Sequence, residues 1–264
     1  MTDFGLTDTY VGVMKGVVAG INPEARVIDL CHDVAPQDVH GAAFLLACSF
    51  KYFPPGTVHV AVIDPTVGTR RRALCVQSGQ YCFVGPDNGV VSIACYQAGR
   101  PKIFVLENEE YFLQERSRTF HGRDIFAPVA AHVSAGVPVE SLGRRVRSMN
   151  RIRFEAPTVT RGKRLEGRIV HVDGFGNLIT NIDGDCIRRT FPRADSGDLI
   201  ITCGAHSIRG LSECYGDASR GLAVALFGSY SVLEIAVRDG NASSSLGVGR
   251  GDTVKIEASD TRTV

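Results

Sequence analysis

The sequence predicts an α/β domain with a largely parallel sheet over residues 1–158, followed by a smaller all-β domain, a barrel or sandwich, over residues 159–264. Three observations predict this fold class. The length of 264 residues corresponds to about two domains of roughly 150 residues each. Helix-like and strand-like patterns alternate over about the first 140 residues, which favours a largely parallel sheet. Beyond about residue 160, short strand patterns separated by glycines follow one another, as in all-β folds.

The elements of the first domain are expected from apolar spacing and from turn residues. Val11, Met14 and Val18 fall on one side of a helix that Asn22-Pro23 ends. Ser78-Gly79 lies between two strand patterns and predicts a hairpin. In chain order we expect a helix at 10–21, a strand at 26–31, a helix at 37–51, a strand at 58–63, strands at 74–77 and 81–84, a helix at 87–97, a strand at 102–106 and a helix at 124–134.

The second domain shows no helical pattern, and its apolar and β-branched residues form short runs between glycines. Such a chain buries its apolar faces by closing into a barrel or by packing two sheets together. The strands expected here are 167–172, 178–182, 198–202, 222–227, 231–237 and 253–256.

Charge and composition narrow the class of partner. The 29 Lys and Arg residues nearly balance the 28 Asp and Glu residues, so we expect a small-molecule partner and neither nucleic acid nor a membrane. No apolar run approaches the ~20 residues that span a bilayer, and Met1-Thr2-Asp3-Phe4 does not begin a secretion signal, so we expect a cytoplasmic protein. The eight cysteines include no CxxC pair and no zinc-finger spacing, which predicts buried thiols and no metal site.

Four polar clusters surround glycines at the predicted ends of strands. Asp64 ends a buried strand, so its carboxylate either caps the next turn or faces a ligand, and Arg71 can keep it ionised. His121 is the candidate that titrates near neutral pH, although pattern alone favours a structural role for it. The chain has no Gly-x-Ser-x-Gly, Walker or HExxH motif, which disfavours serine hydrolases, P-loop NTPases and zincins. The clusters are residues 2–8, 64–71, 119–124 and 171–177.

Taken in order, these clusters resemble the S-adenosyl-L-methionine (SAM) hydrolase (adenosine-forming) family, the SAM hydroxide adenosyltransferases, which are related to the fluorinase and chlorinase. The resemblance extends from Thr2 to about Glu257. Its motifs are Thr2-Asp3-Phe4-Gly5 with Tyr10-Val11-Gly12-Val13-Met14-Lys15-Gly16, Asp64-Pro65 with Val67-Gly68-Thr69, Pro86-Asp87-Asn88-Gly89, Thr119-Phe120-His121-Gly122-Arg123-Asp124, Phe175-Gly176-Asn177-Leu178-Ile179-Thr180-Asn181, and Leu233-Glu234-Ile235-Ala236.

The resemblance implies hydrolysis of SAM to adenosine and L-methionine by in-line attack of an activated water or hydroxide at C5′. The family's catalytic triad would fall on Asp64, Arg71 and His121, with Arg71 chosen by its seven-residue offset from Asp64. The resemblance also implies no cofactor, because SAM is the substrate, and a homotrimer with the active site at the subunit interface. The substrate-binding residues it implies are Asp3 at the ribose hydroxyls, Phe120 near the sugar or adenine, Phe175, Asn177, Ser229, Glu234 and the Val237 backbone around the adenine, and Asp8, Asp173, Ser229 and Tyr230 at the methionine end.

Two alternative functions stay open at this point. A SAM-dependent halogenase, forming a 5′-halo-adenosine, is disfavoured because His121 and Gly122 stand where its pattern has Tyr and Ser. Asp64 also replaces an expected aromatic residue, and the hairpin at 75–83 leaves no room for the long insertion of the fluorinase. A non-catalytic SAM- or adenosine-binding protein would share most binding residues, and the intact triad is the argument against it. Family members have a strand before Thr2, so we expect an N-terminally extended version to be more stable.

Overall fold

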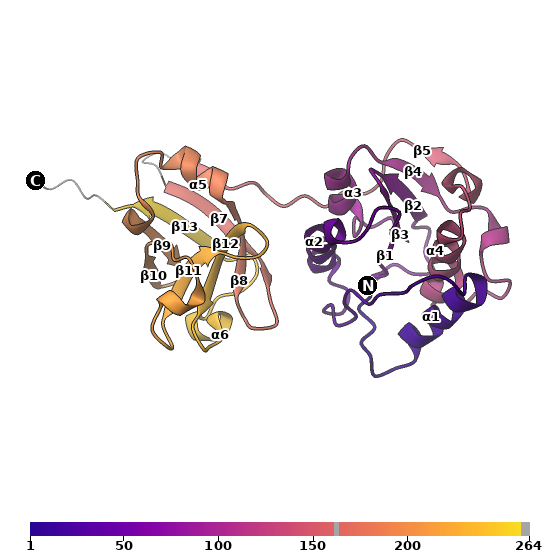
Figure 1. Ribbon diagram of the computed structural model, residues 1–264, viewed down its shortest axis with the longest axis horizontal. Helices are drawn as coiled ribbons and strands as arrows, with labels where there is room; N and C mark the ends of the chain where they lie inside the picture. The colour runs from indigo at the N-terminus through magenta and orange to yellow at the C-terminus, as the bar shows by residue number, and fades with distance from the viewer. Residues whose placement is uncertain (161–163, 260–264) are drawn as a thin grey trace, which may run out of the picture. The chain divides into compact units, whose positions relative to one another are not determined.

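The computed structural model describes residues 1–160 and 164–259, and the chain forms two compact units, Met1–Arg153 and Phe154–Val264. Each unit has its own buried apolar core. The sequence pattern places the boundary after residue 158, and the packing places it after Arg153. Figure 1 shows the elements of both units with their labels.

The first unit contains both helices and strands, as its apolar spacing predicts, but two helices come first and three strands then follow one another. Its elements are α1 (Tyr10–Ile21), α2 (Val39–Ser49), η1 (Phe50–Tyr52), β1 (Val58–Val60), β2 (Ala73–Ser78), β3 (Tyr81–Pro86), α3 (Ser92–Ala98), β4 (Lys102–Val105), η2 (Glu109–Tyr111), the π-helical segment η3 (Gly122–Phe126), α4 (Ala127–Ser134), η4 (Val139–Leu142) and β5 (Arg145–Val146). The Asp38 carboxylate accepts a hydrogen bond from the Gly41 N–H, which caps α2 and explains why this helix begins at Val39.

The sheet of the first unit has the strand order β1-β3-β2-β4-β5. β1 is parallel to β3, but β2 is antiparallel to both β3 and β4, and β4 is antiparallel to β5. The expected largely parallel sheet is therefore not confirmed, because this sheet is mixed. Gly79 and Gln80, with a φ of 56° at Gly79, join β2 to β3 in a tight hairpin, and a connection this short permits only antiparallel pairing.

Helices cover both faces of this sheet (Figure 1). Side chains alternate along β2, so Leu74 and Val76 join the core cluster under α2 and α3. Cys75 points the other way and joins the cluster under α1 and α4. All three side chains are fully buried. The turn after β1 and the loop before η3 therefore extend from a packed unit of three layers, in which the sheet lies between two layers of helices.

Residues 26–31, all of them described, do not form the expected strand. Val27 and Ile28 are 46% and 54% exposed, so this apolar run is not buried in the sheet. Its end instead contacts the N-terminal segment, where the Thr2 N–H donates to the Cys31 carbonyl oxygen at 3.0 Å. Thr2 also forms a parallel bridge with Val62, directly beyond β1.

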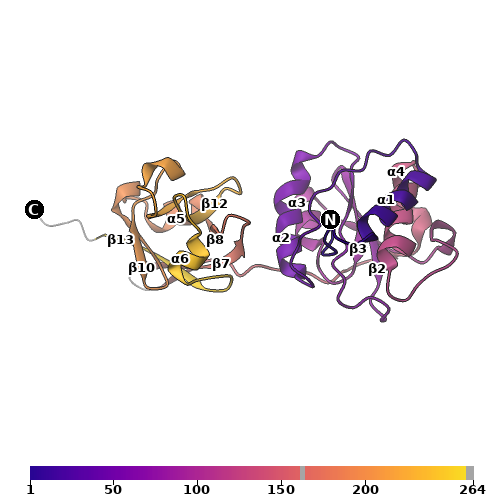
Figure 2. The same cartoon turned by 90° about the horizontal axis from the view of Figure 1, so that it is seen from below.

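The second unit consists mainly of β-strands. Its elements are β6 (Thr158–Thr160), β7 (Arg164–Val172), β8 (Leu178–Asp183), α5 (Gly184–Thr190), η5 (Ser196–Asp198), β9 (Leu199–Cys203), β10 (His206–Arg209), η6 (Tyr215–Asp217), β11 (Ala223–Phe227), β12 (Val232–Val237), α6 (Ala242–Leu246) and β13 (Thr253–Ala258). The strand order is β10-β9-β13-β7-β8-β12-β11, and β6 pairs with β7. A bridge between Ser212 and Leu226 links the segment after β10 to β11, so the curved sheet nearly closes into a barrel (Figure 2).

The expectation of an all-β second domain is right for the sheet but misses α5 and α6. The Asp183 side chain accepts the Cys186 N–H and caps α5, and the Asn241 side chain accepts the Ser244 N–H and caps α6. These helices span only seven and five residues. Elements this short are below the window in which helical spacing can be recognised.

Three features of the described residues concern the expected absence of disulfides, membrane helices and metal sites. Each of the eight cysteines is free, and Cys75, Cys95 and Cys203 are buried. Within 1–160 and 164–259, no helix combines the length and the apolar character needed to cross a membrane. The same ranges contain no group of three or more His, Cys, Asp or Glu side chains arranged to hold a metal ion.

Candidate active site

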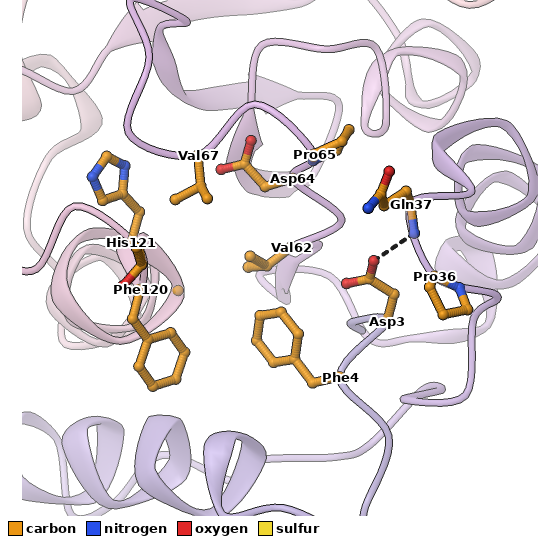
Figure 3. A pocket seen from close by; sticks show the side chains of 12 residues that line it. Asp3, Phe4, Pro36, Gln37, Val62, Asp64, Pro65, Val67, Phe120 and His121 are labelled. Atoms are coloured by element: carbon orange, nitrogen blue, oxygen red, sulfur yellow. Dashed lines mark hydrogen bonds between the residues drawn. The ribbon is translucent and has the colours of Figure 1, made fainter.

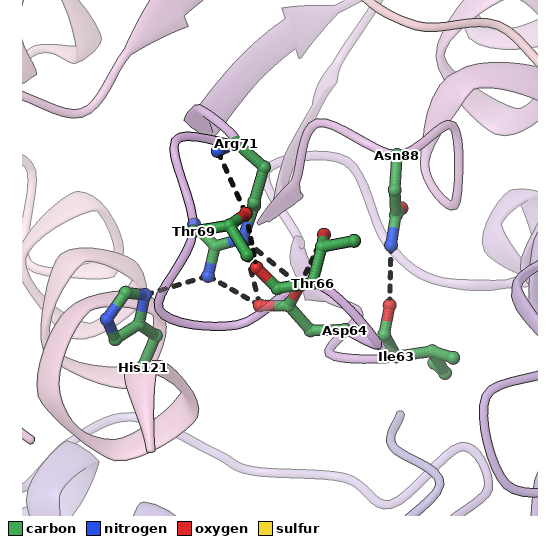
Figure 4. Close-up of polar contacts among 7 residues, drawn as sticks. All are labelled: Ile63, Asp64, Thr66, Thr69, Arg71, Asn88 and His121. Carbon is green, nitrogen blue, oxygen red and sulfur yellow. Dashed lines mark hydrogen bonds and ion pairs between the residues drawn. The ribbon is translucent and has the colours of Figure 1, made fainter. Parts of the chain in front are cut away.

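Asp64, Arg71 and His121 form one hydrogen-bonded cluster in the first unit (Figure 4). Arg71 Nε donates to the two Asp64 carboxylate oxygens at 3.1 and 3.0 Å, and Arg71 Nη2 also donates to Asp64 Oδ2. The same Nη2 donates to His121 Nδ1 at 2.8 Å. The Asp64 and Arg71 side chains are buried, so this charge-assisted contact is little screened by water. Arg71 thus bridges an acid and an imidazole that lie far apart in the sequence.

The hydrogen bond from Arg71 determines which nitrogen of His121 carries the proton. A guanidinium only donates, so Nδ1 must be an unprotonated acceptor, and the neutral ring carries its proton on Nε2. Burial, together with the nearby Arg71 cation, lowers the pKa of His121 below its ordinary value. We infer that His121 is neutral at neutral pH, with its Nε2–H available as a donor.

The turn after β1 and the loop before η3 approach each other closely at Gly68. The φ of Gly68 is 76°, and a Cβ at this position would lie 2.5 Å from the Arg118 carbonyl oxygen. His121 directly precedes η3, and π-helical turns are frequent at functional sites. The Arg71 guanidinium lies 5.2 Å from the centre of the Phe126 ring within that segment. Residues of both loops therefore hold Arg71 in one place.

A cavity of about 350 Å³ opens beside this cluster (Figure 3). Asp3 Oδ2 accepts the Gln37 N–H at 2.8 Å, and the other Asp3 oxygen faces the cavity in the figure. The rings of Phe4 and Phe120 meet edge to face, 5.9 Å apart between centres. A cavity with carboxylates on one side and aromatic rings on another suits a ligand that has both hydroxyls and an apolar face. Its lining residues are Asp3, Phe4, Pro36, Gln37, Val62, Asp64, Pro65, Val67, Thr119, Phe120, His121 and Gly122.

A second polar cluster lies in the second unit. Asp173 Oδ1 accepts the N–H groups of Phe175 and Asn177, both at 2.9 Å, and Asn177 Nδ2 donates to Asp173 Oδ2 at 3.1 Å. The Tyr215 hydroxyl donates to Glu234 Oε1 at 2.6 Å. Glu234 is buried, and burial raises its pKa. Phe175 is 80% exposed, so an accessible aromatic ring accompanies these polar groups.

Family comparison covers both units. Residues 1–143 match the family model of the SAM hydroxide adenosyltransferase N-terminal domain, and residues 167–255 match that of the C-terminal domain. The chain belongs to the SAM hydroxide adenosyltransferase family. The resemblance inferred from the ordered motifs is thereby confirmed.

Named relatives of the chain include hydrolases and fluorinases. An (R)-S-adenosyl-L-methionine hydrolase from Thermus thermophilus is 37% identical over 263 residues, covering 97% of both chains. A fluorinase from Nocardia brasiliensis is 28% identical over 208 residues, covering 69% of both chains. Among solved structures, an uncharacterized conserved protein from Thermotoga maritima superposes with a TM-score of 0.89 at 39% identity, covering 97% of both chains. The hydrolase therefore matches more of the chain, and more closely, than the fluorinase does.

The structure brings some of the predicted site residues into the first-unit cavity. Asp3, Asp64, Phe120 and His121 line it. Asp8 lies elsewhere, in an open depression at the start of α1 that contains residues such as Leu6 and Lys15. Arg71 is bonded to two lining residues without lining the cavity itself.

The predicted site residues between Ser229 and Val237 lie in the second unit. Ser229 and Tyr230 lie in the turn between β11 and β12. A Cβ on Gly228 would lie 2.0 Å from Glu234 Oε2, so this turn packs directly against the Glu234 carboxylate. The Val237 side chain is buried in the apolar core of the second unit.

Two residues with site contacts had no signal in the sequence. Gln37 supplies the N–H that binds Asp3, and it adopts a positive φ of 65°, which is uncommon for a residue with a side chain. Tyr215 supplies the hydroxyl that binds Glu234. Neither residue belongs to one of the polar clusters that surround a glycine. Gln37 and Tyr215 lie 34 and 19 positions along the sequence from the residues they bind, and a local sequence pattern cannot predict contacts over such separations.

Proposed function

We propose that the chain hydrolyses SAM to adenosine and L-methionine. A water-derived oxygen attacks C5′, the C5′–O bond forms as the C5′–S bond breaks, and the electron pair leaves with the sulfur of methionine. The bonded Asp64, Arg71 and His121 cluster beside a cavity carries this proposal, and the hydrolase name of the full-length relative supports it. Because a sulfonium is already a good leaving group, the protein has to supply a positioned and desolvated nucleophile.

The three triad residues have different roles in this proposal. The Nε2–H of neutral His121 donates to the attacking oxygen and orients it, because Nδ1 is already bonded to Arg71. The proton of the water moves toward Asp64, the anion of the cluster. Arg71 holds the Asp64 and His121 side chains in place through its hydrogen bonds to both. Proton transfer to a positioned base contributes typically ~10²- to 10⁴-fold to a rate.

Substrate contacts are assigned on the same basis. Asp3 accepts hydrogen bonds from the ribose hydroxyls, since one carboxylate oxygen faces the cavity, and Phe120 packs near the sugar or adenine (Figure 3). SAM is the substrate, and the reaction uses no cofactor. The further contacts that we propose are Phe175, Asn177, Ser229, Glu234 and the Val237 backbone at the adenine, and Asp8, Asp173, Ser229 and Tyr230 at the methionine end.

Product analysis tests the reaction. Purified protein incubated with SAM in H₂¹⁸O should release methionine and adenosine labelled at the 5′-oxygen. A 5′-halo-adenosine formed in chloride or fluoride would instead assign a halogenase. Stoichiometric binding of SAM without turnover would assign a binding protein.

Variants of the triad test its roles. His121→Ala and Asp64→Ala should each lose most of the turnover, and wild-type turnover in both would refute the mechanism. His206→Ala is a matched control, because His206 is an exposed histidine on β10. It should turn over SAM at the wild-type rate.

We further propose a cytoplasmic homotrimer in which the first unit of one subunit and the second unit of the next complete the site. The presence of proposed substrate contacts in both units supports shared sites, and the eight free cysteines suit a reducing compartment. Sedimentation equilibrium should give the mass of three chains. Asp64→Ala and Glu234→Ala chains, each inactive alone, should regain activity when refolded together, and a mixture without activity would contradict shared sites.

A further inference from the structure

A buried hydrogen-bonded relay lies behind Asp3 in the first unit. Thr2 Oγ1 and His32 Nδ1 are 2.8 Å apart, and His32 Nε2 and Asp29 Oδ1 are 3.0 Å apart. Lys15 Nζ donates to Asp29 Oδ2 at 2.7 Å. Thr2 is 1% exposed and His32 is 9% exposed, while Lys15 and Asp29 reach solvent. Thr2, His32, Asp29 and Lys15 thus connect the buried start of the chain to the surface.

For a neutral His32, the two ends of this relay determine its proton arrangement. The Phe4 N–H, which can only donate, lies 3.3 Å from Thr2 Oγ1, and the Asp29 carboxylate can only accept. The hydrogen bond from Lys15 lowers the pKa of Asp29, so this carboxylate stays ionised. Each bond then has one proton if Thr2 donates to His32 Nδ1 and the His32 Nε2–H donates to Asp29.

The relay is connected to Asp3 and Phe4, the two cavity-lining residues that lie between Thr2 and Gly5 in the sequence. The Thr2 N–H donates to the Cys31 carbonyl oxygen at 3.0 Å, and the Gly5 N–H donates to the His32 carbonyl oxygen at 2.8 Å. Asp3 and Phe4 lie between these backbone bonds, and the Phe4 N–H is held by the Thr2 hydroxyl. The relay is therefore the side-chain part of a clamp on the backbone that carries Asp3 and Phe4.

We propose that His32 is a positioning residue that, through Thr2 and Asp29, fixes the Asp3 carboxylate against the ribose hydroxyls of the substrate. This inference rests on the proposed function, because it takes Asp3 as the ribose contact. Its specific consequence is that a broken relay weakens recognition of the ribose hydroxyls and leaves the contacts to the rest of the nucleoside unchanged.

Binding of adenosine and of 2′,3′-dideoxyadenosine to the full chain, measured by calorimetry, tests this consequence. Two hydroxyls bonded to a carboxylate should favour adenosine on the order of 100-fold in the wild-type protein. Thr2→Val keeps the shape and removes the hydroxyl, and His32→Leu removes both ring contacts. Both should lower this preference about tenfold without changing the affinity for dideoxyadenosine. His32→Asn, whose side-chain oxygen can still accept from Thr2, should restore part of the preference.

Ser92→Ala is the matched control. Ser92 is also buried in the first unit, and its hydroxyl donates to the Gly89 carbonyl oxygen at 2.7 Å and accepts the Ile152 N–H at 3.0 Å, but it does not line the cavity. Ser92→Ala should lower stability and keep the preference. An unchanged preference in Thr2→Val and His32→Leu, or equal losses for both nucleosides, would overturn the positioning role alone. A wild-type protein with no preference for adenosine would instead overturn the ribose assignment of Asp3 and the inference that rests on it.

Discussion

Replacing His59 with phenylalanine is expected to remove an acid-sensitive component of the stability of the first unit. His59 lies on β1, is 6% exposed, and has a buried Nε2 with no hydrogen-bond partner among the described residues. Its ring stacks on Phe83, with 5.2 Å between centres and 20° between planes, and Phe53 and Tyr81 also contact it. Burial in this aromatic surrounding lowers the pKa of His59 to about 4.

The sign and size of the effect follow from this pKa. In the unfolded chain the histidine has its ordinary value of 6.5, so between about pH 6.5 and pH 4 the unfolded state binds a proton that the folded state does not. The free energy of unfolding therefore decreases as the pH falls through this window. A difference of about 2.5 pKa units corresponds to about 3 kcal/mol, complete near pH 4.

Urea unfolding of both proteins between pH 4 and pH 7 measures this contribution. Far-UV circular dichroism is a suitable signal, because the chain has no tryptophan. The wild-type free energy should fall by about 3 kcal/mol more than that of His59→Phe over this range. His206→Phe controls for the loss of a histidine at an exposed strand position. Parallel pH curves for wild type and His59→Phe would refute the reasoning.

Three further substitutions test the candidate site. Arg71→Lys replaces a planar fork by one ammonium that cannot bond both of its partners in the same way, so turnover assays should show kcat lower on the order of 10²-fold. Gly68→Ala places a Cβ against the Arg118 carbonyl oxygen at a positive φ, so both the melting temperature and kcat should fall, and an unchanged melting curve would contradict this. Tyr215→Phe removes the donor that favours ionised Glu234, so urea unfolding should show a loss of about 1 kcal/mol at pH 7 and a smaller loss at pH 4, where this carboxylate is protonated.

Predictions from the sequence succeeded where a segment's own residues decide its conformation. The helix over 10–21 and the hairpin around Ser78-Gly79 depend on spacing and turn chemistry within a few positions. The strand over 26–31 was wrong because an apolar run only becomes a strand if a neighbouring strand covers it, and Val27 and Ile28 are exposed. The parallel sheet was wrong because alternating elements do not encode the direction in which β4 runs beside β2.

Local patterns and ordered motifs thus identified the two-part organisation, most helices and strands, the family, and Asp64, Arg71 and His121 as candidates. Only the tertiary structure revealed that Arg71 bridges the other two, which places the proton of His121 on Nε2. Only the tertiary structure also revealed the antiparallel direction of β4 beside β2, the hydrogen bond from Gln37 to Asp3 and the hydrogen bond from Tyr215 to Glu234. Local conformation depends on residues a few positions apart, whereas the contacts of Arg71 with His121, Gln37 with Asp3 and Tyr215 with Glu234 join residues 50, 34 and 19 positions apart. They form only when the packed cores bring distant loops together, and no periodicity in the chain records that packing.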